Sequence, residues 1–334
     1  MKRLKRIKYL LACLTVMAFA LALAPGAQAE KWQLSIQWPE GNFSTKGVME
    51  FAELVKERTD GQLVIQVHAG GSLGFKGPDM LQAVKDGLVP AGEMLLGGVA
   101  GTEPIMDFST MPFLVANHGE AHLLGVVARP YVEKVFKKWN QKLLYWQYWP
   151  GAGLYTKKEI NSLEDLKGLK LRTFNNISTQ WAKKAGAKPN SIPWGDVYMA
   201  LSTGSIDGVL TSSVSGADGK FWEVMDHFTN FGFTFGYSAV TVNLDSWKKL
   251  PAEIRLIVME TAREMEAKQE LRSIEADKTS MAKLDEHDMK ISENPVQLRQ
   301  QCAEIAEPIW EQWIKEAGPD GRQIIENFRE LSGK

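Results

Sequence analysis

Cysteine and long apolar runs are both scarce in this sequence of 334 residues. It contains two cysteines, and Cys13 falls in a leader segment that we expect to be removed. Cys302 would then be alone, so that no internal disulfide can form. After Ala29 no apolar run reaches the roughly 20 residues that a membrane-spanning helix needs. These absences exclude a small disulfide-stapled module and leave no candidate transmembrane helix after Ala29.

A basic surface is also missing. The 39 Lys and Arg residues are balanced by 40 Asp and Glu residues, which gives a formal net charge of -1. Five basic residues and no acidic residue lie in the leader, so its removal takes the net charge to about -6. Nucleic-acid binding depends on clustered Lys and Arg, and no such cluster is present. We therefore expect no nucleic-acid partner.

The leader has the three parts of a secretory signal peptide. A basic start, "MKRLKRIK", precedes an apolar run at 9–25, and the small residues "GAQA" follow it. A transmembrane anchor is the alternative, but the apolar run is short for a bilayer span. "LLAC" at 10–13 resembles a lipoprotein box, yet the apolar stretch would then follow the cysteine. We expect residues 1–29 to be a signal peptide, cleaved after Ala29, and the mature protein to be periplasmic.

Strands and helices alternate along the rest of the chain. Apolar alternation and β-branched residues predict strands at 31–38, 62–68, 91–98, 142–149, 169–173, 205–212 and 237–244. Capping residues and apolar spacing predict helices at 44–61, 77–87, 117–141, 161–168, 178–186, 196–204, 251–287, 297–318 and 322–331. This order predicts an α/β fold with a largely parallel sheet.

The helical pattern at 251–287 is too long for one small domain at about 1.5 Å per residue. A coiled coil is the alternative, but its heptads are irregular, so a helix that spans two domains fits better. No flexible linker separates the halves of the chain, which indicates that it crosses between them more than once and forms a cleft. We predict domain I at 30–149 with about 238–270, and domain II at 150–237 with about 271–334.

Three long motifs occur in a fixed order, and two short ones precede them. The long motifs are "INSLEDLKGLKLRT", "AGAKPNSIPWGDVYMALSTGSIDGV" and "VTVNLDSWKKLPAEIR", and the short ones are "GGSLG" and "MPFLV". Together they resemble the substrate-binding subunits of TRAP transporters, the DctP family, over essentially the whole mature chain. The resemblance implies a two-domain periplasmic binding protein fold with a ligand cleft, crossover strands and a long domain-spanning helix.

The same resemblance implies the function. A receptor of this family captures a small organic acid and delivers it to a membrane permease driven by an ion gradient. It implies no catalysis and no cofactor. We expect a monomer with a carboxylate ligand and with TRAP permease subunits as its partners.

Arg172 ends the strand predicted at 169–173. The planar fork of arginine holds a carboxylate by two parallel hydrogen bonds, which lysine cannot do. In the resembling family a signature arginine at the end of this "KGLKLR" strand grips the ligand carboxylate, and Arg172 matches it. Ligands of open α/β sheets bind outside the carboxyl ends of strands. We expect Arg172 to hold the ligand, with a surface salt bridge as the alternative.

Other positions follow from the resemblance with less support. Trp194 in "IPWGDVY" matches an apolar position that packs against the ligand, although a core tryptophan is an equal alternative. Where family members read "DGQENP", this chain reads "DGVLTS", so that the position of a ligand-binding Asn falls on Thr211, with Ser212 beside it. Some sugar-acid binders of the family carry a second Arg where this chain reads "YWPGAGLY". The absence of a basic residue there puts a second carboxylate clamp in doubt.

Aromatic residues near the predicted crossings can form the walls of a cleft. Trp38 follows the first strand, and Trp149 and Tyr237 lie near the crossings between the halves. With a single Arg and flat apolar walls, the sequence favours a monocarboxylate with an apolar or aromatic body, such as an aryl or branched-chain oxo or hydroxy acid. A C4-dicarboxylate or a sugar acid is the alternative, and simple core packing is the alternative role of these aromatic residues.

Two patterns suggest enzyme or metal chemistry. "GGSLG" around Ser72 fits the G-x-S-x-G of a hydrolase elbow, but "FKGPD" follows where a helix must begin. His118 and His122 are four residues apart, as metal ligands on a helix are, but Gly119 stands where a metalloprotease needs Glu. An exported hydrolase is therefore the weaker hypothesis. We expect neither a catalytic residue nor a metal site.

Overall fold

The computed structural model describes residues 29–293 and 295–333. The predicted signal peptide lies outside the described residues except for Ala29, so it stays a prediction. None of the helices in the described ranges is both long and apolar enough to span a membrane.

Within these ranges ten strands form one sheet in the order β2-β1-β3-β9-β4-β7-β5-β6, with β8 paired to β4 and β10 paired to β8. The strands are β1 (Glu30–Ser35), β2 (Leu63–His68), β3 (Ala91–Leu95), β4 (Gln141–Thr156), β5 (Lys170–Thr173), β6 (Lys188–Ser191), β7 (Gly208–Ser212), β8 (His227–Asn230), β9 (Phe235–Asn243) and β10 (Lys290–Glu293).

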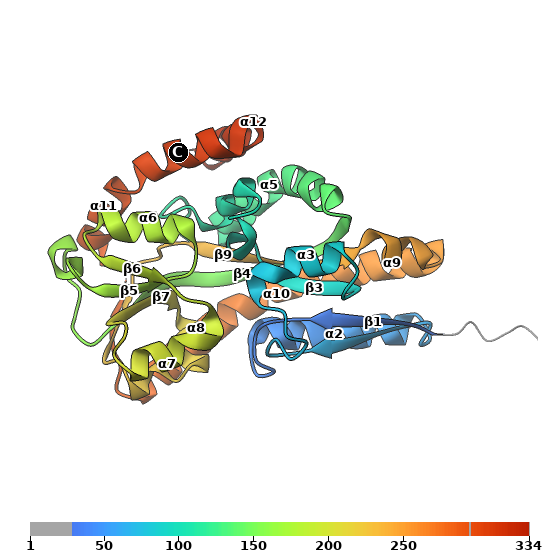
Figure 1. Cartoon of the computed structure of the whole chain (residues 1–334), viewed down its shortest axis with the longest axis horizontal. Coiled ribbons are helices and arrows are strands. Elements are labelled where there is room, and N and C mark those ends of the chain that lie inside the picture. The colour runs from blue at the N-terminus through green and yellow to red at the C-terminus, as the bar shows by residue number, and fades with distance from the viewer. Residues whose placement is uncertain (1–28, 294, 334) are drawn as a thin grey trace, which may run out of the picture.

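Helices cover the sheet and join its strands (Figure 1). The α-helices are α2 (Phe43–Arg58), α3 (Met80–Lys85), α4 (Leu96–Val99), α5 (His118–Lys138), α6 (Asn176–Lys184), α7 (Val197–Ser202), α8 (Ser213–Asp218), α9 (Leu244–Lys249), α10 (Ala252–Glu286), α11 (Val296–Glu304) and α12 (Glu307–Ser332). The short 3₁₀ helices are η1 (Gly77–Asp79), η2 (Pro104–Thr110), η3 (Leu163–Leu166), η4 (Trp194–Asp196) and η5 (Phe221–Glu223).

The sheet is parallel at its two ends and antiparallel in its centre. β1 pairs in parallel with β2 and β3, and β5 pairs in parallel with β6 and β7. Between these ends β3–β9, β9–β4 and β4–β7 are antiparallel. Figure 1 shows β4 and β9 side by side through the middle of the molecule. The prediction of a largely parallel sheet therefore holds for the outer strands, whereas the two strands that join the ends run in opposite directions.

β4 is the longest strand and crosses from one end of the sheet to the other. It pairs with β9 as far as Gly151 and with β7 from Ala152 onward, with a register shift between Tyr148 and Gly151. Pro150 lies at this shift, where the lack of an amide donor does not cost a ladder hydrogen bond. The strand predicted at 142–149 is therefore real but continues past the proline to Thr156.

The long helix predicted at 251–287 is confirmed as α10. It packs against α2 and β4, and further along against α8 and β10, so it touches elements at both ends of the sheet. α12 packs mainly on α5 and η2, with a smaller contact to α6. The boundaries of the two predicted domains stay a prediction.

Two predicted elements end earlier than expected. The strand predicted at 91–98 stops at Leu95, where α4 begins, and a Cβ at Gly97 would lie 2.5 Å from Thr110 Cγ2. Glycine therefore permits the close approach of α4 to η2. The helix predicted at 297–318 is interrupted after Glu304, because Pro308 cannot continue it and would clash with the carbonyl of that residue.

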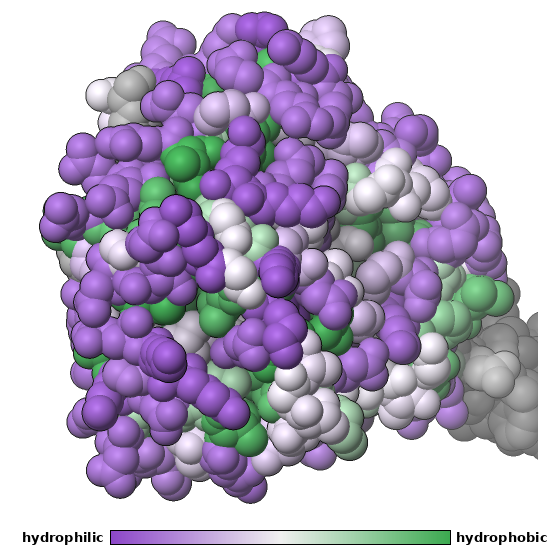
Figure 2. All heavy atoms as spheres, turned by 60° about the vertical axis from the view of Figure 1, so that its left-hand side comes forward, coloured by the Kyte–Doolittle hydropathy of each residue, from purple (hydrophilic) through white to green (hydrophobic). Residues whose placement is uncertain are grey.

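Most large aromatic side chains fill the core. Trp32, Trp146, Trp181 and Trp313 are each at most 1 % exposed. The face drawn in Figure 2 is mainly hydrophilic, with apolar residues in small separate groups. The aromatic residues that remain for a ligand site are therefore few.

Candidate functional site

One cavity lies where the two ends of the sheet face each other. It encloses about 520 Å³ of empty space, including the part open to solvent. Its wall comes from the carboxyl ends of β3, β5 and β7, from the segment after β1, and from the crossover strands β4 and β9. The residues that line it are Trp38, Leu95, Thr110, Trp149, Pro150, Ala152, Arg172, Phe174, Trp194, Thr211, Ser212, Ser215, Thr234 and Gly236. Strand ends of this kind are where α/β proteins bind small molecules.

Arg172 is the one charged side chain among these lining residues. It is 5 % exposed, and its Nε and Nη1 atoms donate hydrogen bonds to the carbonyls of Ile192 (3.0 Å) and Leu210 (3.3 Å). These bonds hold the guanidinium at the end of β5. Burial lowers the pKa of Arg172 to about 9, so that it stays charged at neutral pH. Within the described ranges Arg172 has no acidic partner, which is costly for a buried charge.

Three indole rings form the aromatic wall of the cavity, and we use this name for Trp38, Trp149 and Trp194. The ring centroids of Trp38 and Trp149 are 4.5 Å apart at an angle of 54°, and those of Trp38 and Trp194 are 6.2 Å apart. Phe43 packs edge-on against Trp149 from behind, with centroids 4.9 Å apart. Tilted aromatic contacts of this kind are favourable and rigid. The wall is therefore aromatic and is built from rings that are tilted against one another.

Two buried polar groups support this wall from the side away from the cavity. Trp38 Nε1 donates to Glu93 Oε1 at 3.1 Å, and Trp149 Nε1 donates to Ser238 Oγ at 2.9 Å. Glu93 and Ser238 are completely buried. Burial raises the pKa of Glu93 to about 7, while the nearby Ser238 hydroxyl and the Trp38 N–H act in the opposite direction. The sequence analysis did not single out Glu93, because a single Glu within a strand pattern is expected on the solvent-exposed face of the strand.

The two hydroxyl residues predicted at the end of β7 have different roles. Ser212 caps α8: its Oγ accepts from the amide of Ser215 at 3.2 Å and donates to Ser215 Oγ at 3.1 Å. Thr211 lines the cavity and its hydroxyl makes no hydrogen bond with any described residue. Thr211 therefore offers a donor and an acceptor to a ligand, whereas Ser212 is already engaged.

Tyr237 does not line the cavity. Its side chain is completely buried between Phe108 and Tyr148, with ring centroids 5.2 Å away in both cases, and its hydroxyl donates to the carbonyl of Ala121. The structure thus brings six of the seven predicted residues to one cavity and keeps Tyr237 apart. The reason is that β9 turns this residue towards α5, and its neighbour Gly236 lines the cavity instead.

The cavity lining also contains Phe174 and Thr110, which the sequence analysis did not single out. Phe174 follows directly from the Arg172 strand, and that position was a usable signal. Thr110 comes from η2 and accepts a hydrogen bond of 2.7 Å from Asn175 Nδ2, which also donates to Asp107 Oδ1 at 2.8 Å. Burial raises the pKa of Asp107 to about 7. No local sequence pattern predicts the contact between Asn175 and Asp107, since these residues are 68 positions apart in the chain.

A wider mouth continues from the cavity to the surface and shares Trp38, Arg172 and Trp194 with it. Lys76 and Asp196 face each other across this mouth with Nζ and Oδ2 3.7 Å apart, and both are exposed. Such an exposed pair contributes little to stability. The mouth thus has an exposed ion pair at its rim, while the inner cavity is aromatic with one buried cation.

The residues of the rival chemistries do not assemble into a catalytic site. Ser72 is exposed in a turn between β2 and η1, and no helix follows it directly. His122 Nδ1 lies 3.0 Å from Glu270 Oε2, whereas His118 Nδ1 is buried without a hydrogen-bond partner. The described residues contain no group of three or more His, Cys, Asp or Glu side chains that can hold a metal. What does assemble is a binding cavity of the kind found in solute receptors.

The comparison with family profiles agrees with this class. The profile of the bacterial extracellular solute-binding proteins, family 7 (DctP), matches residues 34–316. The chain belongs to this family, the periplasmic substrate-binding subunits of TRAP transporters, and the resemblance stated from its motifs is confirmed.

Solved structures have the same two-domain fold. An extracytoplasmic solute receptor of Bordetella pertussis binding pyroglutamic acid is 29 % identical, with a TM-score of 0.87, over 90 % of this chain and all of that chain. A TRAP solute-binding protein of Chromohalobacter salexigens with bound D-glucuronate is 21 % identical, with a TM-score of 0.84, over 90 % of this chain and 99 % of that one. The second likeness shows the fold alone, and the predicted fold class is confirmed.

A curated relative extends the comparison. The monocarboxylate 2-oxoacid-binding periplasmic protein of a Nostoc species is 30 % identical over 237 residues, which are 68 % of this chain and 64 % of that protein. The relatives named here are described as binding proteins and are periplasmic or extracytoplasmic.

Proposed function

We propose that this receptor captures a small monocarboxylate with a compact apolar or aromatic body and delivers it to an ion-gradient-driven TRAP permease. The observation that carries the proposal is Arg172, a buried cation with no counter-charge among the described residues. A buried charge is stable only when paired and hydrogen-bonded. A ligand carboxylate supplies that partner and accepts two parallel bonds from the guanidinium.

The lining favours one carboxylate over two. No second Lys, Arg or His lines the inner cavity, and Lys76 at the mouth already faces Asp196. A second ligand carboxylate would therefore meet indole rings and the hydroxyl of Thr211. The aromatic wall suits an apolar body instead, and burying a small ring contributes a few kcal/mol at about 25 cal/mol per Å².

The ligands of the similar proteins support this choice. Pyroglutamic acid, bound by the Bordetella receptor, is a monocarboxylate on a compact ring, and the Nostoc protein is described as binding monocarboxylate 2-oxoacids. The aryl and branched-chain acids expected from the sequence share the same feature of one carboxylate on a compact body. A C4-dicarboxylate or a sugar acid is the alternative from the sequence, and the cavity lining does not favour it.

A ligand panel tests the proposal. Calorimetry on the mature chain compares L-pyroglutamate, 4-methyl-2-oxopentanoate and phenylpyruvate with succinate and D-glucuronate. We expect at least one of the first three to bind, and the last two to bind more weakly or not at all. Tighter binding of succinate or D-glucuronate contradicts the monocarboxylate assignment. Mass spectrometry of the ligand retained through native purification gives an independent answer.

Location and partners complete the proposal. We expect the mature protein to act in the periplasm as a monomer, which size-exclusion chromatography with light scattering checks. The two ends of the sheet supply different walls of the cavity, so a bound acid would contact both predicted domains. A ligand that binds both walls favours the closed form by its differential affinity. Small-angle scattering with and without the bound acid measures this closure, and an unchanged radius of gyration contradicts it.

A further inference from the structure

Glu93 on β3 lies directly behind the aromatic wall. Its side chain is completely buried, and Oε1 accepts the hydrogen bond of 3.1 Å from Trp38 Nε1. Oε2 has no hydrogen-bond partner among the described residues, and no described cation forms an ion pair with this carboxyl. A buried carboxyl without a counter-charge costs folding free energy. Buried groups that cost stability in this way are expected at sites where the residue has a functional role.

The second indole of the wall bonds to a serine that is a neighbour of the same carboxyl. Trp149 Nε1 donates to Ser238 Oγ at 2.9 Å, and Ser238 is a diagonal cross-strand neighbour of Glu93, since Glu93 pairs with Val240 and Leu95 pairs with Ser238. A serine hydroxyl can accept one hydrogen bond while it donates another. The indole of Trp149 therefore bonds to Ser238, a cross-strand neighbour of Glu93, while the indole of Trp38 bonds to Glu93 directly.

We propose that Glu93 is a positioning residue that holds Trp38 directly and Trp149 through Ser238, and so determines which ligand bodies fit the cavity. The inference rests on the proposed function, because the ligand body would lie against these two rings. Their centroids are 4.5 Å apart at an interplanar angle of 54°. Rotation of either ring changes the width of the cavity, since both residues line it.

The charge of Glu93 changes near neutral pH. Burial raises its pKa to about 7. The groups that face it are Trp38 after β1, Ser238 on β9 and Tyr145 on β4, while Arg272 on α10 and Glu50 on α2 act on Tyr145. Above pH 7 the carboxyl is negative beside a cavity that receives an anion. A bound anion therefore favours protonated Glu93, so affinity is highest below about pH 7 and falls as the pH rises past it.

The indole N–H signals of the ligand-free protein test the link directly. These signals are recorded by ¹H–¹⁵N NMR across neutral pH and assigned with Trp38→Phe and Trp149→Phe. We expect both indoles to titrate with one shared midpoint near 7 in the unmodified protein, neither to titrate in Glu93→Gln, and only Trp38 to titrate in Ser238→Ala. Glu93→Gln keeps the shape of the side chain, so the fold is retained. Titration that persists at either indole in Glu93→Gln overturns the proposal.

A matched control separates Glu93 from buried acids in general. Asp107 is also buried with a pKa raised to about 7, but it contacts Thr110 and Asn175 and no tryptophan of the wall. Asp107→Asn should therefore leave both indole titrations in place, and their loss in this variant contradicts a specific role of Glu93.

Ligand affinity supplies the second readout. Calorimetry with L-pyroglutamate should show a several-fold loss of affinity between about pH 6 and about pH 8.5 in the unmodified protein, and a nearly constant affinity in Glu93→Gln. The same loss in Glu93→Gln overturns the proposal. The indole signals are recorded without ligand, so they test the role of Glu93 even if L-pyroglutamate does not bind. Failure of L-pyroglutamate to bind would count against the proposed function, not against the role of Glu93.

Discussion

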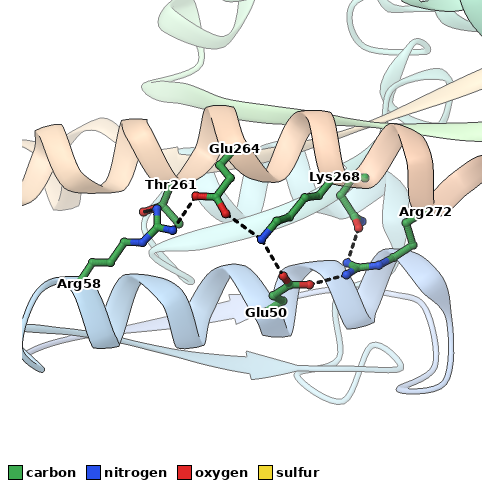
Figure 3. A network of polar contacts seen from close by, with 7 residues as sticks. Glu50, Arg58, Thr261, Glu264, Lys268 and Arg272 are labelled. Atoms are coloured by element: carbon green, nitrogen blue, oxygen red, sulfur yellow. Dashed lines mark hydrogen bonds and ion pairs between the residues drawn. The ribbon is translucent and has the colours of Figure 1, made fainter.

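Charged side chains are paired at the contact of α2 with α10 and unpaired around the cavity. Figure 3 shows the first arrangement, in which Glu50 on α2 lies between Lys268 and Arg272 of α10. Arg58 donates to Thr261 at 3.2 Å and to Glu264 at 2.6 Å. These side chains are partly exposed, so water shares in their solvation. The network links α2 to α10, and each charged side chain in it has a partner of opposite charge.

The cavity has the opposite arrangement. Arg172 and Glu93 are both almost fully buried, and neither has an opposite charge among the described residues. Their pKa values move towards the neutral form because burial dominates, downward for Arg172 and upward for Glu93. At the α2–α10 contact the pKa of Glu50 is lowered instead, chiefly by its hydrogen bond with Arg272. The paired charges thus link two helices, whereas the unpaired ones lie in or beside the cavity where we propose that the ligand binds.

Removal of the unpaired cation should give the largest effect. We expect Arg172→Ala to weaken binding of the preferred carboxylate by about 2–5 kcal/mol, by analogy with buried hydrogen-bonded charge pairs. Arg172→Lys keeps the charge but loses the fork, so it should also bind clearly more weakly. Calorimetry measures both variants.

The matched control for Arg172 is an arginine of the paired network. Arg272 lies on α10, away from the cavity lining, so Arg272→Ala should leave affinity unchanged and lower stability modestly. Equal losses of affinity in the two variants would remove the distinction between paired and unpaired charges. Unchanged affinity in Arg172→Ala would remove this residue from the ligand site.

The pH dependence of stability should have opposite signs for Glu93 and Glu50. The pKa of Glu93 is raised from 4.5 to about 7, so between these values the folded state keeps a proton that the unfolded state loses. The free energy of unfolding therefore falls as the pH rises through this window, by roughly 3 kcal/mol in total, and is level above it. Urea unfolding of the unmodified protein and of Glu93→Gln at about pH 5 and about pH 8 measures this difference. A fall of the same size in Glu93→Gln would show that Glu93 is not its source.

A contact beside the cavity should show an intermediate effect. Asn175 caps α6, since its Oδ1 accepts from the Ser178 amide at 2.9 Å, and its Nδ2 holds the buried Asp107. We expect Asn175→Ala to lower the free energy of unfolding by about 1–3 kcal/mol, because a helix cap and a partner of a buried group are both lost.

The control for this contact is a cap without a buried carboxyl. Asn117 caps α5 by accepting from the amide of Glu120 at 2.9 Å at an exposed site. Asn117→Ala should cost about 1 kcal/mol, the ordinary loss for a cap. If urea unfolding gives the same value for both variants, the contact of Asn175 with Asp107 contributes nothing measurable.

The sequence predicted local elements well because their signals are local. The pattern at 251–287 predicted α10 within one residue at each end, and the strand at 169–173 placed Arg172 at a carboxyl end. The pairing of β8 with β10 was not predicted, since it joins short segments that are more than 60 residues apart in the chain. Strand pairing depends on which segments meet in the fold, and periodicity within one segment does not contain that information.

The site shows the same limit. Trp38 and Trp149 line the cavity as expected, but Tyr237 does not, because neighbouring residues of β9 point to opposite sides and Tyr237 points into the core. The role of Glu93 depends on Trp38, which is 55 residues away in the chain. Composition and residue spacing therefore could not predict that Glu93 is buried.

The smallest effect is expected at the paired charges. Glu50→Gln removes the partner of Lys268 and Arg272 at a partly exposed site, so it should lower the free energy of unfolding by less than about 1 kcal/mol. The pKa of Glu50 is lowered in the folded state. Its contribution to stability is therefore present at pH values above the usual pKa of Glu, and it is lost as the pH falls through the folded-state pKa. Salt should reduce it further.

Glu57 on the same helix is the matched control, since it is exposed and no ion pair with it occurs among the described residues. Urea unfolding at low and high salt compares Glu50→Gln with Glu57→Gln, and only the first should respond to salt. A loss in Glu50→Gln as large as that in Asn175→Ala would mean that the paired network is more than a surface contact. The contrast with the cavity would then rest on Arg172 and Glu93 alone, whose burial without partners does not depend on the strength of the network.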